Sequence, residues 1–139
     1  MVNSIIDGIS IKLNTLFGDN YEIYSENIEQ GLKTPCFFIL LLNPMSTLKL
    51  GNRQLREYNF DIHYFPHSYS KNQEINEVIE TLIDGLEYIT LLNSDLIRGT
   101  DMHAEIIDDV LHFFINYKMY IRKEAPVEET METLEMKTR

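Results

Sequence analysis

Residues 2–17 form the first regular pattern of apolar and polar positions in the chain. Their apolar side chains recur every three or four residues and share one face, which predicts an amphipathic helix. Ile11 falls on the opposite face and is expected to be exposed in a monomer. Ser4, followed three residues later by Asp7, can cap the start of this helix, and Gly18 suits a left-handed exit from it.

A second helical pattern, the most regular in the sequence, begins at Ser70. Ser70 and Gln73 have the spacing of a capping box. An apolar arc follows, made of Ile75, Val78, Ile79, Leu82, Ile83, Leu86 and Ile89. The opposite arc is acidic and comprises Glu74, Glu77, Glu80, Asp84 and Glu87. A solvated helix face is the usual role of such an acidic stripe.

Alternation of apolar and polar residues predicts the strands, most clearly over 55–65 and 110–122. The side chains expected on one face are Tyr58, Phe60, Ile62 and Tyr64 in the first segment, and Leu111, Phe113, Ile115, Tyr117, Met119 and Ile121 in the second. Shorter strands are predicted over 21–25, 48–52 and 102–107. Gly51-Asn52 indicates a bulge or turn, and Asp108-Asp109 indicates the turn of a final hairpin.

Residues 36–42 are apolar at every position, which predicts a strand that is buried on both faces. Asn43-Pro44 ends this strand. An antiparallel sheet normally leaves one face wet, so the second face needs a cover, either a helix or another subunit. Cys36, the single cysteine, can form neither an internal disulfide nor a cysteine metal cluster, and we expect a buried, unreactive thiol.

The expected order of elements is helix, three or four strands, helix and two strands. Such segregated runs predict an α+β domain with two amphipathic helices packed on a mainly antiparallel sheet. A chain of 139 residues fits one domain, which we assign to residues 1–122. Residues 123–139 are expected to form a mobile acidic tail, because Ala125-Pro126 breaks the last strand and few apolar residues follow.

The formal net charge is −10, from 12 basic and 22 acidic residues. An acidic surface repels phosphate backbones, so tight binding of nucleic acid is not expected. The longest apolar run is too short to span a bilayer, and the first residues lack the basic start of a signal peptide. We therefore expect no membrane association and no export.

Lys49, Arg53 and Arg56 place three basic residues within eight positions of this acidic chain. Charged residues at strand edges protect a sheet against aggregation. A basic cluster can also contact an acidic partner or passing DNA. The sequence leaves both roles open.

Catalytic motifs are not evident in the sequence. The carboxylates lie in no recognisable catalytic setting, the glycines form no phosphate loop, and nothing resembles a nucleophile elbow. The most suggestive set comprises Asp61, His63, His67, His103 and His112. A metal site is conceivable because Asp61 and His63 share a strand face, but the spacings match no established zinc motif. We therefore expect no catalytic residue, no cofactor and no bound metal.

Two segments of the chain resemble a known protein family. The first is residues 53–66, RQLREYNFDIHYFP, and the second is residues 110–117, VLHFFINY. Their signature is a strand pattern, an aromatic residue two positions before Phe-Asp-Ile-x-Tyr-Phe. Both segments resemble the phage tail terminator family of prophages and defective phage-like elements in Gram-positive bacteria. The likeness runs from the first helix to about Arg122.

The resemblance implies a non-enzymatic structural protein of a virion or phage-tail-like particle, assembled in the bacterial cytoplasm. Its subunits are expected to form a ring, commonly hexameric, that caps the head-proximal end of the tail tube and stops its growth. The implied partners are copies of itself and the tail tube protein, joined by the sheath in contractile systems and the head connector in complete phages, with DNA only as passing cargo. For the subunit or tube interface we predict Phe38, Leu40, Leu42, Lys49, Arg53 and Arg56.

Other functions remain open on the sequence alone. A head-completion or neck connector protein is also small, acidic and ring-forming. A ligand-binding or enzymatic α+β domain could use the histidines near Asp61, and a monomeric adaptor is a third possibility.

Overall fold

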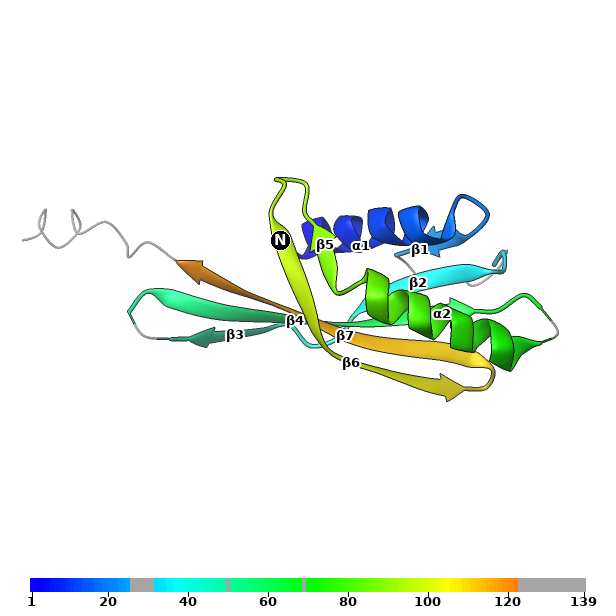
Figure 1. The fold of residues 1–139 in the computed structure, drawn as a ribbon. Coiled ribbons are helices and arrows are strands. Elements are labelled where there is room, and N and C mark those ends of the chain that lie inside the picture. The colour runs from blue at the N-terminus through cyan, green and yellow to red at the C-terminus, as the bar shows by residue number, and fades with distance from the viewer. Residues whose placement is uncertain (26–31, 50, 69, 123–139) are drawn as a thin grey trace, which may run out of the picture.

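The computed structural model describes residues 1–25, 32–49, 51–68 and 70–122. Two helices, α1 (Val2–Phe17) and α2 (Lys71–Gly85), lie against the same face of a curled sheet (Figure 1). The strands are β1 (Glu22–Tyr24), β2 (Cys36–Leu41), β3 (Met45–Leu48), β4 (Arg53–Phe65), β5 (Tyr88–Thr90), β6 (Leu96–Ile107) and β7 (Val110–Arg122). No helix in this described part is long and apolar enough to cross a membrane.

The seven strands form one mixed sheet with the order β1-β2-β4-β7-β6-β5, and β3 pairs with β4 beyond the end of β2. Only the pairing of β1 with β2 is parallel among the pairings described. The long strands β4 and β7 form the central pair, in register from Arg53↔Arg122 to Tyr64↔Leu111. The expected α+β class with a mainly antiparallel sheet is confirmed, although three strands follow α2 instead of two.

The hydrophobic core lies between the helices and the sheet. Its fully buried side chains include Ile5, Ile9 and Leu13 of α1, Ile75 and Leu82 of α2, and Phe37, Phe60, Ile62, Tyr64, Leu111, Phe113 and Tyr117 of the strands. The alternation predicted for β4 and β7 is thereby confirmed over Tyr58–Tyr64 and Leu111–Tyr117, where every second residue is buried in this core, whereas Met119 and Ile121 are only half-buried. Burial of this apolar surface is the main force that holds the two layers together.

The ends of α1 differ in part from the sequence prediction. The helix begins at Val2, so Ser4 lies inside it, and the predicted cap at Ser4 is wrong. Gly18 ends the helix with a φ of 89°, a backbone conformation that favours glycine, as expected. Ile11 is 57% exposed, which confirms that it lies on the outer face.

The start of α2 is also built differently from the predicted capping box. Ser70 precedes the helix, but its side chain makes no capping hydrogen bond. Instead, the carboxylate of Glu74 accepts hydrogen bonds from the backbone N–H groups of His67 and Ser68, at 3.0 Å and 2.8 Å. Glu74 therefore leaves the predicted solvated acidic stripe and fixes the loop that enters the helix.

Several strand predictions need correction, and the strand predicted over 102–107 already begins at Leu96. The strand expected over 48–52 is β3, which begins at Met45 directly after Asn43-Pro44, and Gly51 lies in the turn that follows. The second helix ends at Gly85, and Ile89 belongs to β5, a strand that the helical spacing of its apolar residues concealed. The final turn is confirmed, because Asp108 and Asp109 link β6 to β7 with φ values of 51° and 64°.

The tail predicted over 123–139 lies outside the described residues. The division of the chain into a domain and an acidic tail therefore stays a prediction.

Candidate functional site

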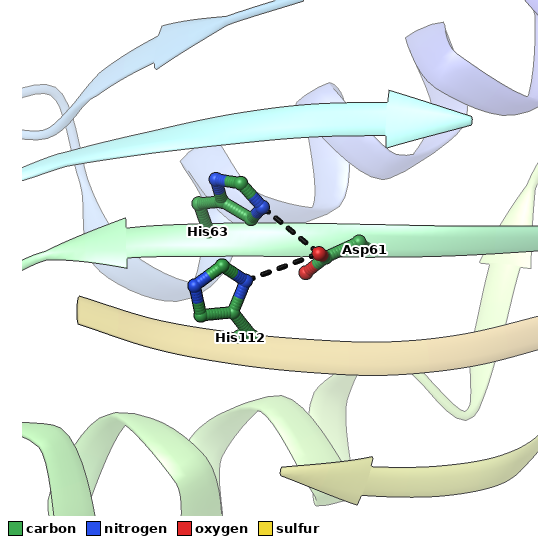
Figure 2. Close-up of side chains that lie close together, drawn as sticks. All are labelled: Asp61, His63 and His112. Atoms are coloured by element: carbon green, nitrogen blue, oxygen red, sulfur yellow. Dashed lines mark hydrogen bonds and ion pairs between the residues drawn. The ribbon is translucent and has the colours of Figure 1, made fainter. Parts of the chain in front are cut away.

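The face of the sheet opposite the helices carries a cluster of polar side chains at its centre. Asp61 and His63 project from β4 and His112 from β7, with the helices behind the sheet (Figure 2). Two apolar residues of β2 flank the cluster, since Phe38 pairs with His63 and Leu40 with Asp61. Alternation along β4 places the cluster on this face, because its apolar neighbours are taken up by the core.

The three side chains of the Asp61 cluster, which comprises Asp61, His63 and His112, converge on one carboxylate oxygen. Oδ2 of Asp61 lies 2.9 Å from Nε2 of His63 and 3.1 Å from Nδ1 of His112 (Figure 2). The two imidazole rings approach edge to face, with centroids 4.2 Å apart. One ligand-type atom from each residue lies within 4.8 Å of the other two. This arrangement has the donor types of a transition-metal site.

Asp61 is a buried carboxylate, which is rare unless the charge is paired. It is only 7% exposed, and its second oxygen, Oδ1, is buried without a hydrogen-bond partner in the described part of the chain. Burial by itself raises the pKa of Asp61, but the hydrogen bonds and charges of His63 and His112 outweigh it and lower the pKa below its ordinary value. The two imidazoles thus hold a buried carboxylate in its ionised form.

The remaining histidines of the suggestive set lie elsewhere. The Nδ1 atom of His67 is 3.1 Å from the hydroxyl oxygen of Thr34, with Thr34 just before β2 and His67 just after β4. His103 on β6 stacks on the ring of Phe114, with centroids 4.5 Å apart. The structure therefore brings together three of the five residues that the sequence singled out.

The apolar residues predicted for the interface differ in accessibility. Phe38 is 5% exposed, Leu40 is half-buried and Leu42, directly after β2, is 43% exposed. The strand is thus buried on both faces over Cys36–Ile39, as expected, but open at its end. A groove of about 250 Å³ lies beside Leu42 and is lined by Leu42, Asn43, Asn59, Phe60, Asp101, His103, Phe114 and Ile115. Of the apolar trio, Leu42 offers the largest free surface.

The predicted basic residues lie on a different part of the molecule. We define the arm as β3, residues 53–57 of β4 and residues 118–122 of β7, which extend beyond both helices (Figure 1). Lys49 and Arg53 are exposed at its end, while Arg56 is half-buried. The guanidinium of Arg53 lies 5.1 Å from the ring centroid of Tyr120. The six predicted interface residues therefore form two separate groups.

The arm also exposes apolar side chains that the sequence prediction did not assign to the interface. Met45 is 51% exposed, Leu48 is 70% exposed and Tyr120 is 61% exposed. All four residues of β3 are exposed. The sequence gives only a weak indication of β3, because a segment of four residues between Pro44 and the turn at Gly51 is too short to show the alternation of a strand.

The chain matches a family model described as phage tail terminator protein, over residues 4–129. The matched segment includes α2, all seven strands and nearly all of α1. No curated protein matches the chain significantly.

Proposed function

Because this chain belongs to the phage tail terminator family, we propose that it ends the growth of a phage tail by forming a closed ring on the tail tube. The family is one of structural tail proteins, so membership favours an architectural role over catalysis. The proposed ring caps the head-proximal end of the tube and provides the surface for joining further components. Six copies is the number we expect, as the resemblance implies.

The observation that best supports assembly is the arm. It projects past the helices and has no core of its own, while Leu48 and Tyr120 are more than half exposed (Figure 1). Its edge strand β3 pairs with β4 on one side, and no strand of the described residues pairs with the other side. Exposed apolar surface and open strand edges are typical of partner sites. We infer that the arm packs against a neighbouring subunit.

A ring built from identical subunits needs two different surfaces, because each copy contacts the next head to tail. The groove beside Leu42 and Phe114 is the second surface that we propose, since it lies on the helix-free face and includes exposed apolar atoms. Closure of the ring buries both surfaces and leaves no free end.

The distribution of charge on the subunit is consistent with contact between the arm of one copy and the surface of the next. The basic end of the arm, with Lys49 and Arg53, would approach neighbours that are acidic overall, since each chain has a net charge of −10. An acidic lining of the ring would also let DNA pass without adhering to it.

Electron microscopy of assembled tails tests the proposal. We expect one closed ring of this protein at the head-proximal end of the tube, and tails of uncontrolled length when its gene is deleted. A protein that repeats along the tube, or is absent from the tail, would contradict the proposed function. A ring on the head connector, with tails of normal length in the deletion, would instead identify a neck protein.

A further inference from the structure

We propose that Asp61, His63 and His112 form a binding site for a transition-metal ion of the zinc class on the helix-free face of the sheet. The argument for this site does not rest on the proposed ring, although Phe114 borders both the site and the groove beside Leu42. It also departs from the expectation of no metal, which was based on spacing along the chain.

The first argument is the geometry of the donors. A tetrahedral zinc ion with bonds of about 2.0–2.1 Å holds neighbouring ligand atoms roughly 3.3 Å apart. The observed separations from Oδ2 of Asp61 are 2.9 Å to His63 and 3.1 Å to His112. Small rotations of the side chains would bring the three donors to ligand distances around one ion. Each ring would then bind the ion through the nitrogen that now faces Oδ2, as a neutral imidazole that carries its proton on the other ring nitrogen.

The second argument is the unsatisfied carboxylate oxygen of Asp61. Oδ1 of Asp61 is buried, and it has no hydrogen-bond partner within the described ranges. A buried carboxylate without full hydrogen bonding is costly, and a bound cation offsets that cost. Since Asp61 is 7% exposed, its carboxylate would bind the ion from a buried position.

The surroundings complete the site. Phe38 and Phe114 are the cross-strand neighbours of His63 and Asp61, and they limit the water around the donors. The side chains of His63 and His112 are still 20% and 19% exposed, which leaves one side open for a water ligand. Glu105 lies directly across from His112 in the β6–β7 pairing and adds a further negative charge near the opening. An imidazole-rich set with a carboxylate favours Zn²⁺ over Mg²⁺.

Zinc binding to the full-length protein tests the site directly. The protein is treated with a chelator, transferred to metal-free buffer and titrated with zinc chloride in a calorimeter. We expect one Zn²⁺ per chain, and no comparable binding of Mg²⁺. Folded wild-type protein that binds no zinc, or that binds Mg²⁺ equally well, would overturn the proposal.

Variants locate the binding. Asp61→Asn, His63→Gln and His112→Gln should each weaken zinc binding at least tenfold, since even loss of an outer partner of a metal ligand costs about 10–100-fold. His103→Gln is the matched control, because His103 lies on the same face but stacks on Phe114. Unchanged affinity in the three cluster variants, or an equal loss in the control, would contradict the assignment. Circular dichroism checks that each variant is folded.

NMR of the wild-type protein locates the metal without relying on variants, which could fail to fold. Zinc should shift the NMR signals of the His63 and His112 rings and leave those of His67 and His103 in place. Shifts confined to His67 or His103 would show that the metal binds outside the cluster and would refute the site.

Discussion

The hydroxyl group of Tyr64 in β4 donates a hydrogen bond to the carboxylate of Glu74 in α2. The same carboxylate accepts the backbone N–H groups of His67 and Ser68, so one side chain joins the central strand, the following loop and the second helix. Burial raises the pKa of Glu74, but hydrogen bonds from Ser68, Tyr64 and His67 outweigh it and lower the pKa to about 2. The pKa of Tyr64 is raised by burial and by its bond to Glu74.

This relationship predicts a specific dependence of stability on pH. The pKa of Glu74 falls from 4.5 to about 2 on folding, so its contribution is present above pH 4.5 and is lost as the pH falls toward 2. Glu74→Gln should cost about 1–2 kcal/mol of unfolding free energy at neutral pH and less at pH 3, measured by urea denaturation. Glu77→Gln, on the exposed side of the same helix, is the control and should change little. A difference between wild type and Glu74→Gln that is constant with pH would contradict the prediction.

Cys36 should react slowly in the native protein. Its side chain is fully buried, and burial, with a smaller effect of Glu22, raises its pKa to about 11. Little thiolate is therefore present at neutral pH, and the thiolate is the reactive form. A colorimetric thiol reagent should label Cys36 only after denaturant is added. A Ser46→Cys variant, with its second thiol on exposed β3, should gain one rapidly labelled group. Rapid labelling of the native wild type would refute this prediction.

Gly99 in β6 lies where a side chain does not fit. An added Cβ atom would lie 2.4 Å from Cδ1 of Ile115 and 3.0 Å from the backbone oxygen of Leu86. That oxygen is held in place, because it accepts a hydrogen bond of 2.7 Å from the hydroxyl of Tyr117. Gly99→Ala should therefore destabilise the protein by about 1–3 kcal/mol in chemical denaturation, through overpacking against fixed backbone.

Gly85→Ala is the matched control for this effect. The three atoms nearest to a Cβ atom there all belong to the Leu16 side chain, with Cδ1 at 2.3 Å. Leu16 is half-buried and can change rotamer, and alanine favours the helix that ends at Gly85. We expect a clearly smaller loss of stability than in Gly99→Ala. Equal losses in both variants would show that the contact with Leu86 is not the cause.

The elements that could be predicted from the sequence are those whose local pattern agrees with their environment. The alternation of β4 survives in the structure because one side faces the helices along most of its length, and Tyr58 and Tyr64 are both buried. The prediction fails at β5, where Ile89 continues the helical spacing of α2 but lies in a strand. The spacing alone could not distinguish the two, because Ile89 is buried in either case.

The Asp61 cluster could be predicted only in part. Asp61 and His63 are two positions apart on one strand, so alternation places them on the same face. His112 follows Asp61 by 51 positions, and only the register of β4 with β7 pairs it with His63. That register depends on packing across the whole sheet, which no short motif records. The sequence prediction assigned Lys49, Arg53 and Arg56 to the interface but missed the apolar residues of the arm, because the exposure of Leu48 depends on where the helices end.

The arm leads to the most direct prediction about assembly. Leu48 is 70% exposed, so Leu48→Asp should change the unfolding free energy of the isolated subunit by less than about 0.5 kcal/mol. If the arm packs against a neighbouring subunit, the same change places a charge in an apolar contact and should prevent ring closure, because an unpaired buried charge is costly. Tails assembled with this variant should lack the terminal ring and vary in length under the electron microscope. Leu92→Asp provides the control, since Leu92 is 68% exposed but lies between β5 and β6, away from the arm. Tails of normal length with Leu48→Asp, or equally defective tails with Leu92→Asp, would show that the arm is not the contact that closes the ring.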